Sequence, residues 1–341
     1  MKFLITGGCG FIGSNSADYF LKKGHEVTVL DNMSRKGVEK NLDWLRKNHP
    51  KIKFVKADIR YDQSILNKEV EGKDVVLHFA GQTAVTTSVI NPRKDFEINA
   101  IGTFNVLEAI RNSKTKPMIL ESSTNKVYGG MKDVKVHEVK GRYEYVDFPK
   151  GIPENALLDF HSPYGCSKGC AEQYVIDYGR IYGLRTVVFR QSCIYGYRQF
   201  GVEDQGWVAW FTIATLFNKP LTVYGDGKQT RDVLFVEDLI RAYEMAIENI
   251  DKTSGKAYNI GGGSENQMSL LELVKYLETE FNKKLTIRFN QWRPGDQPVF
   301  VCDITKAKKD FGWEPKINVR KGIQKLSEWV KQNKELFSGL Y

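Results

Sequence analysis

A glycine-rich stretch near the N-terminus, TGGCGFIG (6–13), constrains the fold more than any other feature of the sequence. It follows the apolar run KFLIT (2–6) directly and leads into the helical pattern of NSADYFLKKG (15–24). Glycines in such a place allow a tight turn, a close approach of the backbone to a pyrophosphate, and close contact between helix and strand. The N–H groups at the start of the helix can bind an anion. The residues expected to line this site are Gly7, Gly10, Phe11, Ile12 and Gly13.

An acidic residue, Asp31, ends the second predicted strand, HEVTVLD (25–31). A carboxylate at that position accepts hydrogen bonds from ribose hydroxyls and repels a 2′-phosphate, so it favours NAD over NADP. The alternative interpretation is a structural glycine turn with an unrelated surface aspartate. Two later strand ends would complete the site, at the adenine and beside the cofactor: Asp58 with Ile59, and Ala80 with Gly81 and Gln82.

Strand-like and helix-like runs alternate through the first half of the chain, which predicts an α/β fold with a doubly wound, parallel, Rossmann-type sheet. The strand-like runs are 2–6, 25–31, 53–59, 74–80, 117–123 and 185–192, and the helix-like runs are 15–24, 104–112 and 171–183. After about residue 190, turn-rich pieces mix with the helical runs 269–281 and 319–333, which predicts a smaller C-terminal substrate-binding lobe at the ligand-binding edge of the sheet. We expect residues 1–190 and 230–262 to form the cofactor domain, and residues 191–229 and 263–341 to form the lobe.

Composition excludes several classes of protein. The 341 residues are 41% hydrophobic and 27% charged, as in an ordinary globular protein. No apolar run approaches the roughly 18 residues of a membrane span, and the N-terminus lacks the pattern of a signal peptide. The five cysteines are scattered without a second pair or a nearby histidine, so we expect no metal site and a reduced, cytoplasmic protein. The lysines behind the net charge of +9 are dispersed, so we expect no nucleic-acid partner.

The stretch HSPYGCSK (161–168) places Tyr164 and Lys168 four residues apart. On a helix this spacing puts a phenol and an ammonium on one face, one turn from each other. Taken alone, the stretch favours an ordinary helix start, because Ser162 and Pro163 are typical of a helix N-terminus and a Tyr-x-x-x-Lys spacing often arises by chance. The residues themselves leave both interpretations open.

Read together, these segments resemble the extended short-chain dehydrogenase/reductase family of nucleotide-sugar epimerases and dehydratases. The similar elements run over nearly the whole chain in the family's order: TGGCGFIG, Asp31-Asn32, Asp58, HFAG (78–81), Asn99 with Gly102-Thr103, SSTNKVYG (122–129), SPYGCSK (162–168) and YGDGKQTRDVLFVEDL (224–239). The resemblance implies that Tyr164 is the catalytic base, that Lys168 holds the nicotinamide ribose, and that Thr124 bonds the same substrate hydroxyl. It further implies that Asn32 contacts the cofactor and that Asn99 supports the active site.

Four runs are similar to a branch of this family that epimerises CDP-activated deoxyhexoses at C2: DNMSRKG (31–37), SSTNKVYG, LDFHSPYGCSKG (158–169) and RQFGVEDQGWVAWF (198–211). Dehydratases of the family carry Asp-Glu after the threonine, whereas this chain has Asn125-Lys126, and neither side chain is a plausible base for a carbon acid. The resemblance therefore implies transient oxidation to a 2-keto sugar and return of the hydride to the opposite face. The alternatives are a UDP-hexose 4-epimerase or another epimerase of the family, and a degenerate NAD-sensing or scaffold protein.

A CDP-sugar needs cationic groups for its diphosphate, and the resemblance assigns this role to Arg231 and to Arg293. Asp296 would bind the nucleotide ribose or cap a turn, and Thr86 would touch the sugar. Cys193 stands where many relatives have an asparagine, which removes an amide contact and leaves room for the sugar to turn over. Three further residues have two open interpretations each, packing or backbone bonding against a role at the site: His161, Trp207 and Trp210.

Oligomer formation through two exposed helices is usual in this family. The runs FNVLEAI (104–110) and AEQYVIDYGRIYG (171–183) have apolar faces that would serve it. We therefore expect a homodimer or a homotetramer.

Overall fold

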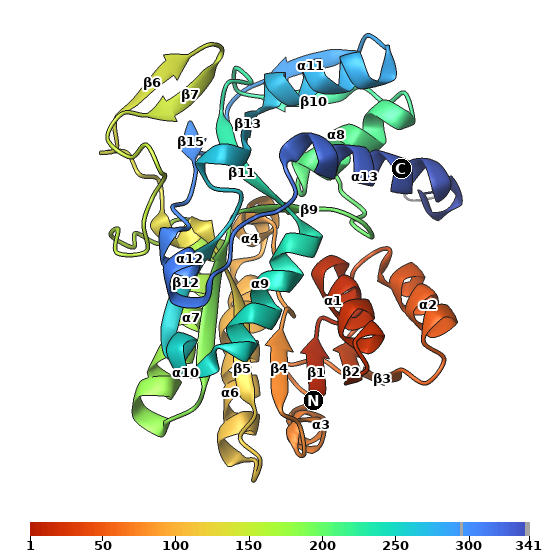
Figure 1. The fold of residues 1–341 in the computed structure, drawn as a ribbon, viewed down its shortest axis with the longest axis vertical. Helices are drawn as coiled ribbons and strands as arrows, with labels where there is room; N and C mark the ends of the chain where they lie inside the picture. Colours follow the sequence, from red (N-terminus) through yellow and green to blue (C-terminus); the bar gives the residue numbers. More distant parts are fainter. Residues whose placement is uncertain (294–295, 338–341) are drawn as a thin grey trace.

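The computed structural model describes residues 1–293 and 296–337 (Figure 1). Its centre is a sheet of seven strands in the order β3-β2-β1-β4-β5-β8-β12, and every neighbouring pair is parallel. The strands are β1 (Lys2–Thr6), β2 (Glu26–Asp31), β3 (Lys53–Lys56), β4 (Val75–His78), β5 (Met118–Thr124), β8 (Thr186–Gln191) and β12 (Lys256–Ile260). The order reverses between β1 and β4, which is where ligands of such sheets bind.

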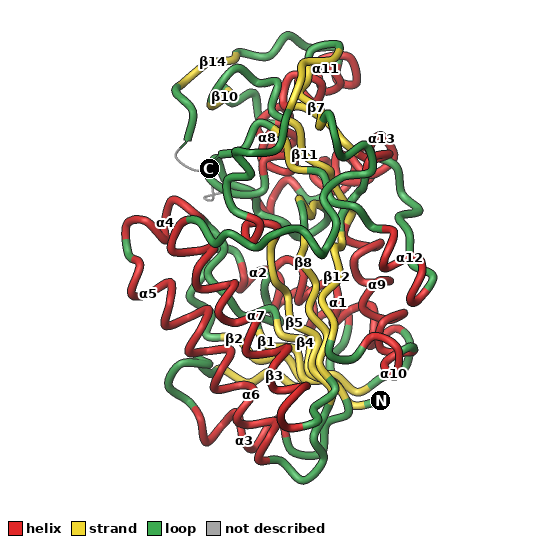
Figure 2. Tube along the Cα trace, turned by 90° about the vertical axis from the view of Figure 1, so that its left-hand side faces the viewer, coloured by secondary structure: helices red, strands yellow, loops and turns green. Residues whose placement is uncertain are grey.

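Helices cover both faces of this sheet, as Figure 2 shows. One face carries α3 (Gln63–Val70), α4 (Val85–Ile90), α5 (Pro92–Phe96), the π-helix η1 (Glu97–Ile101), α6 (Gly102–Asn112) and α7 (Ser162–Tyr182). The other carries α1 (Phe11–Lys22), α9 (Val236–Glu248), α10 (Ile250–Thr253) and α12 (Thr305–Phe311), with α2 (Val38–Asn48) packed beside α1. Because both faces are buried, the central strands read as continuous apolar runs. The predicted doubly wound α/β fold is confirmed.

A smaller lobe lies beyond the carboxyl ends of the sheet strands (Figure 1). Its strands are β9 (Cys193–Tyr195), β11 (Thr230–Phe235), β13 (Gln267–Ser269) and β15 (Val299–Phe300) in one sheet, β10 (Leu221–Tyr224) with β14 (Ile287–Asn290), and the hairpin of β6 (Val136–Val139) and β7 (Arg142–Tyr145). Its helices are α8 (Trp207–Leu216), α11 (Leu270–Phe281) and α13 (Val319–Gln332), with short 3₁₀ turns η2 (Asn125–Tyr128), η3 (Ser264–Asn266) and η4 (Lys334–Phe337) nearby. The lobe is thus assembled from segments far apart in the sequence.

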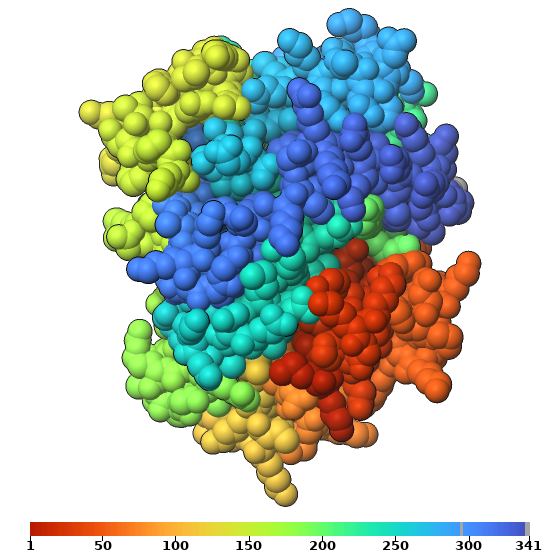
Figure 3. Space-filling view, viewed as in Figure 1, coloured from red at the N-terminus to blue at the C-terminus, as the bar shows by residue number. Residues whose placement is uncertain are grey.

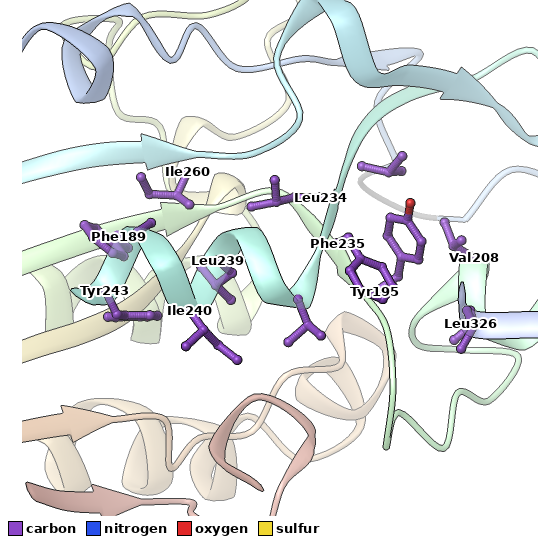
Figure 4. Packing of buried hydrophobic residues seen from close by; sticks show 14 of the residues in the cluster. Phe189, Tyr195, Val208, Leu234, Phe235, Leu239, Ile240, Tyr243, Ile260 and Leu326 are labelled. Carbon is purple, nitrogen blue, oxygen red and sulfur yellow. The ribbon is translucent and has the colours of Figure 1, made fainter. Parts of the chain in front are cut away.

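One hydrophobic core joins the sheet to the lobe (Figure 4). Phe189 on β8 packs against Tyr243 on α9 with ring centroids 4.7 Å apart, and Tyr195 packs edge-on against Phe235 at 5.4 Å. The space-filling view in Figure 3 shows the C-terminal helices seated against α9 and the N-terminal segment. This shared core fixes the position of the lobe over the sheet edge.

Two predicted helices begin at least four residues before their predicted starts, whereas the other predicted elements differ by a few residues at their ends. The helix expected at 171–183 begins at Ser162, so Tyr164 and Lys168 lie in its first two turns. The helix expected at 15–24 begins at Phe11, next to the glycine turn. In α7 the first two turns carry mostly small or polar residues, so the apolar pattern marked only the later part of the helix. In α1 the helix starts directly at the glycine turn with Phe11 and Ile12, before the predicted start. No described helix is long and apolar enough to cross a membrane.

A buried histidine, His78, ends β4 directly beneath the site. Its Nδ1 lies 2.7 Å from the Thr6 hydroxyl and its Nε2 lies 2.9 Å from the Thr103 hydroxyl. Thr103 donates its own proton to the Asn99 carbonyl at 2.6 Å, so it accepts from Nε2–H, and Nδ1 accepts from Thr6. These contacts hold one neutral tautomer. Burial, together with the charge of Lys168, lowers the pKa of His78 to about 3.

We expect His78 to make stability fall with acid. An unfolded histidine binds a proton near pH 6.5, and the folded one does not until about pH 3. The contribution is therefore fully present above pH ~6.5 and is lost as the pH falls toward 3, by roughly 2 kcal/mol between pH 7 and pH 5. Urea unfolding at both pH values, for the wild type and His78→Gln, measures it. The exposed His137→Gln is the matched control, and an equal pH dependence in wild type and His78→Gln contradicts the expectation.

Candidate active site

The glycine turn brings the N-terminus of α1 to the end of β4. Gly7 has φ +67°, and a Cβ there would lie 2.7 Å from the Ala80 nitrogen, so only glycine fits without displacing backbone. A Cβ on Gly13 would overlap the carbonyl oxygen of Gly7. Gly10 precedes the helix, and the N–H groups of Phe11 and Ile12 have no helical partner because they lie in its first turn. This cradle of bare backbone and N–H groups suits a pyrophosphate.

Asp31 lies at the end of β2 with its carboxylate held by backbone. Its Oδ2 accepts from the Cys9 N–H at 3.1 Å, and its Oδ1 accepts from the Met33 N–H at 2.9 Å. Burial raises the pKa of Asp31 above the ordinary value, while these two hydrogen bonds act to lower it. Each carboxylate oxygen keeps further acceptor capacity, which is what the two hydroxyls of an adenosine ribose require.

The residues predicted for the adenine end are already engaged with each other. Asp58 receives two hydrogen bonds from the Arg60 side chain, at 2.9 and 2.8 Å, and one from Asn32 Nδ2 at 2.8 Å. The Arg60 guanidinium holds the pKa of Asp58 well below its usual range. Ile59 is buried, and its side chain lies where a Cβ on Gly102 would be. Contact of these residues with adenine stays a prediction.

The loop after β4 is held to α7 by Asn99 of the π-helix η1. Asn99 Oδ1 accepts from the Gln82 N–H at 2.9 Å, and its Nδ2 donates to Ser167 of α7 at 3.0 Å. A Cβ on Gly81, between Ala80 and Gln82, would lie 3.1 Å from Asn99 Oδ1. Asn99 therefore connects the cofactor side of the sheet to the helix that carries Tyr164, as single π-turns at functional sites often do.

Arg35, in the loop after β2, reaches across the cofactor groove. It donates to the Thr83 hydroxyl at 3.2 Å and to the Gln205 side chain, and Gln205 also donates to Thr83. Arg35 and Gln205 line a cleft together with Gly10 and Phe11. Sequence reasoning missed Arg35 and Gln205, although both lie in runs that carry the resemblance. The cradle, the carboxylate and this bridging cation together fit NAD.

Thr124, Tyr164 and Lys168 come together at the carboxyl end of β5. Thr124 is the last residue of that strand, and Tyr164 and Lys168 project from the first two turns of α7; all three are buried. Burial raises the pKa of Tyr164 above its ordinary value, while the charge of Lys168 and a hydrogen bond with Thr124 act to lower it. Thr124 and Lys168 therefore act on the phenol of Tyr164, which is the group able to exchange a proton.

Lys168 forms a buried ion pair that the sequence analysis missed. Its Nζ lies 2.5 Å from Oε1 of Glu121 on β5, and the two side chains are 8% and 0% exposed. Burial acts to lower the pKa of Lys168, but the charges of Glu121 and Tyr164 outweigh it and the pKa lies above the ordinary value. Lys168 is therefore held protonated beside Tyr164. A glutamate inside the apolar run MILESS (118–123) was the available indication, since fully buried glutamates are almost always paired.

A hydrogen bond to Ser88 of α4 holds the N-terminus of α7 in place. The Ser88 hydroxyl accepts a hydrogen bond from the Tyr164 N–H at 3.2 Å and donates to the Val85 carbonyl at 2.7 Å. Ser88 thus caps one of the N–H groups that a helix start leaves unpaired. Thr86 is half-buried on the same short helix. Its contact with the sugar stays a prediction.

Both arginines predicted for the diphosphate have carboxylate partners in this structure. Arg231 on β11 is buried and pairs with Asp296 at 2.5 Å, so that carboxylate is committed to an arginine in this state. Arg293 bonds Asp204 at 2.9 Å and stacks on Tyr224, with its guanidinium carbon 3.9 Å from the ring centroid. Phosphate oxygens compete well for guanidinium groups, because the geometry of the two ligands is alike.

Cys193 lies on β9, half-buried beside Trp207 of α8. Burial raises the pKa of its thiol, and the positive charge of Arg231 acts to lower it. Trp207 and Trp210 both pack against the large core cluster, in line with the packing interpretation of these residues. His161 precedes α7 and bonds the Asp159 carboxylate at 2.8 Å, with 44% of its side chain exposed, so its partner is a side chain and not the backbone.

Comparison with known proteins gives the family. The chain matches the family described as GDP-mannose 4,6 dehydratase over residues 4–326. The chain belongs to this family. The resemblance to nucleotide-sugar epimerases and dehydratases is thereby confirmed, although the Asp-Glu pair expected of a dehydratase is Asn125-Lys126 here. No group of residues with the makings of a metal site occurs in the described parts of the chain.

Individual relatives of the family resemble the chain along its whole length. A protein named CDP-paratose 2-epimerase from Salmonella typhi is 49% identical over 97% of this chain and 99% of its own. A UDP-glucose 4-epimerase from Mycolicibacterium smegmatis is 32% identical over 98% of this chain and 100% of its own. The crystal structure of UDP-glucuronic acid 4-epimerase from Bacillus cereus, in complex with UDP-glucuronic acid and NAD, has a TM-score of 0.82. It is 29% identical and covers 97% of this chain and 99% of its own.

Proposed function

We propose that this protein is an NAD-dependent epimerase that inverts C2 of a CDP-activated deoxyhexose and converts CDP-paratose to CDP-tyvelose. The observation that carries the proposal is the 49% identity, over 97% of the chain, with a CDP-paratose 2-epimerase. Thr124, Tyr164 and Lys168 support it, because they lie together as an alcohol-oxidising site requires.

Nicotinamide adenine dinucleotide (NAD) is the cofactor. A solved relative holds NAD, and the residues of this chain suit it. Gly7, Gly10 and Gly13 leave room for its pyrophosphate, and Asp31 would hold the adenosine ribose. When bound, NAD supplies a site that takes a hydride from the sugar and returns it to the opposite face.

The protons are handled by the chain itself. Tyr164 removes the proton of the C2 hydroxyl during oxidation and gives it back during reduction, so one base serves both half-reactions. Thr124 bonds the same oxygen and orients it. Lys168, kept protonated by Glu121, stabilises the phenolate form of Tyr164 through its charge.

Direct oxidation at C2 agrees with the residues beside Thr124. In a 3-deoxy sugar, a ketone at C4 is not adjacent to C2 and cannot acidify its hydrogen. A mechanism through the C2 ketone needs no base for a carbon acid, and Asn125 and Lys126 provide none. After oxidation the flat ketone must turn over in the pocket, and the small Cys193 leaves space for that.

The lobe would hold the nucleotide and the cofactor domain would hold NAD. We place the cofactor domain at residues 1–190 and 230–262 and the lobe at residues 191–229 and 263–341. Two pieces inside the first ranges are exceptions and belong with the lobe: strand β11, which pairs with β13 and β15, and the hairpin β6–β7, which packs against them. In the lobe, Arg231 and Arg293 would exchange their carboxylate partners for the diphosphate of the substrate. Asp296, released from Arg231, would then be free to accept hydrogen bonds from the nucleotide ribose.

Proton NMR of the purified protein with CDP-paratose in deuterated buffer tests the function. We expect CDP-tyvelose to form with the hydrogen at C2 retained, because the hydride does not exchange with solvent. Formation of CDP-tyvelose with deuterium at C2 would support the proposed substrate and contradict direct oxidation at C2. Absence of conversion together with activity on UDP-glucose would establish the alternative, a UDP-hexose 4-epimerase.

The protein would act as a cytoplasmic homodimer or homotetramer. The five cysteines are free thiols, which agrees with a reducing compartment. Large apolar side chains are exposed on one stretch of surface formed by η1, α6 and α7: Ile101, Phe104, Tyr174, Ile181 and Tyr182. Burial of this surface between two copies would account for it. Light scattering on the purified protein distinguishes monomer, dimer and tetramer.

A further inference from the structure

Lys126, two residues after Thr124, is fixed next to the catalytic residues by its own backbone. Its N–H donates to the Thr124 hydroxyl oxygen at 3.2 Å, and its carbonyl accepts from the Gly129 N–H at 3.2 Å. A Cβ on Gly165, the neighbour of Tyr164, would lie 3.2 Å from that carbonyl oxygen. The 3₁₀ turn η2 therefore holds the Lys126 backbone between β5 and the start of α7.

The side chain of Lys126 lies among the substrate-side residues of the cleft. The charges of Arg231 and Asp296 and the thiol of Cys193 all act on its ammonium group. Burial lowers the pKa of Lys126, and the positive charge of Arg231 lowers it further, while Asp296 and Cys193 act in the opposite direction. A lysine that is costly to charge beside an arginine is in a place that favours an anionic ligand.

Lys126 differs from the two arginines of the cleft in its partners. Arg231 is paired with Asp296, and Arg293 is paired with Asp204. Over residues 1–293 and 296–337, the Lys126 ammonium has neither an ion-pair partner nor a side-chain hydrogen bond. A half-buried ammonium without a counter-charge is unfavourable unless a ligand supplies one.

The chemistry of the reaction indicates which group of the ligand supplies the negative charge next to Lys126. C2 of a nucleotide sugar is bonded to the anomeric carbon, which carries the β-phosphate, whereas C4 lies across the ring. When C2 is presented to Tyr164 and Thr124, the β-phosphate must therefore come close to the same residues. A cation is needed at that point in a C2 epimerase, and a C4 epimerase has no such requirement there.

We propose that Lys126 binds the β-phosphate of the CDP-sugar and thereby brings C2, and not C4, to Thr124 and Tyr164. Selection of C2 by Lys126 rests on the proposed function. The phosphate contact itself follows from the position of Lys126 and applies to any nucleoside diphosphate in the cleft.

Calorimetric binding of CDP and of CMP to the NAD-loaded protein tests the contact, because only CDP has a β-phosphate. Loss of one charge-assisted hydrogen bond should weaken CDP binding about 10- to 100-fold in Lys126→Met and in Lys126→Gln. Binding of CMP should change less than about twofold, and Lys126→Arg should restore most of the CDP affinity. The exposed Lys132→Met is the matched control and should bind both nucleotides as the wild type does. Melting temperatures show whether each variant is folded.

Turnover separates the two parts of the inference. In the neutral variants we expect KM for CDP-paratose to rise and kcat to fall, because the sugar is held less firmly with C2 at Tyr164. Unchanged CDP affinity in both neutral variants overturns the inference, as does an equal loss for CDP and CMP. A wild type that binds CDP through Lys126 but yields no CDP-tyvelose overturns the proposed function and the C2 part, and supports the phosphate contact.

Discussion

We expect replacement of Tyr164 by phenylalanine to lower kcat for CDP-paratose by a factor of about 10²–10⁴, the usual contribution of a positioned proton-transfer group. The variant removes only the phenolic oxygen, which is the group proposed to take the proton from the C2 hydroxyl. Because the ring of Tyr164 stays in place, we expect the melting temperature and the amount of bound NAD to remain as in the wild type. Initial rates from discontinuous NMR or chromatographic assays measure the effect.

Tyr174→Phe is the matched control for this prediction. Tyr174 lies on the same helix, α7, but is 47% exposed and outside the site. It should retain wild-type kcat. A Tyr164→Phe variant with more than about a tenth of the wild-type kcat would contradict the role of Tyr164 as base.

The second large effect concerns stability. Arg190 on β8 donates to Glu172 of α7 at 2.9 and 2.5 Å, and to the Tyr128 hydroxyl at 2.9 Å. The side chains of Arg190 and Glu172 are 5% and 0% exposed. Arg190→Met leaves the Glu172 carboxylate buried without its cation, and we expect a loss of about 3–5 kcal/mol in the free energy of unfolding. Chemical denaturation followed by circular dichroism measures it.

Two further variants test whether that loss of stability comes from leaving a buried charge unpaired. Arg180 and Asp177 form an exposed pair on the same helix, with side chains 71% and 51% exposed. Arg180→Met should cost no more than about 1 kcal/mol, since solvent screens such a pair. The double variant Arg190→Met with Glu172→Leu should recover much of the stability, because it leaves no unpaired charge. Equal losses for Arg190→Met and Arg180→Met would show that burial of the pair is unimportant.

Much of the NAD-binding part of the site could be predicted from residues that are close together in the sequence. The turn Gly7–Gly13 requires glycine for reasons that act within a few residues, and its place between a strand and a helix is visible in the apolar pattern. Asp31 was found in the same way, as the end of an apolar strand. The family resemblance, the NAD cofactor and the epimerase class were predicted and are confirmed. The individual site residues and the domain bounds stay predictions.

The partners of the catalytic residues could not be predicted. Glu121 and Lys168 are on different elements, and so are Ser88 and Tyr164, and the sequence gives no distance between them. The bridge of Arg35, Thr83 and Gln205 joins three loops in the same manner. Sequence analysis treated Lys126 only as a residue unable to act as a base, and its position beside Arg231 emerged from the structure.

The sequence by itself determined the alternation of strands and helices in the first half of the chain, the cofactor turn, and the pair Tyr164 and Lys168 at one-turn spacing. These depend on local backbone geometry and on the periodicity of apolar residues, which neighbouring positions record. Only the tertiary structure decided that Lys168 is held by Glu121 and that Lys126 has no ion-pair partner among the described residues. Burial and charge pairing depend on which strands of the sheet lie side by side, and that arrangement is set by packing of the whole core and not by any one segment.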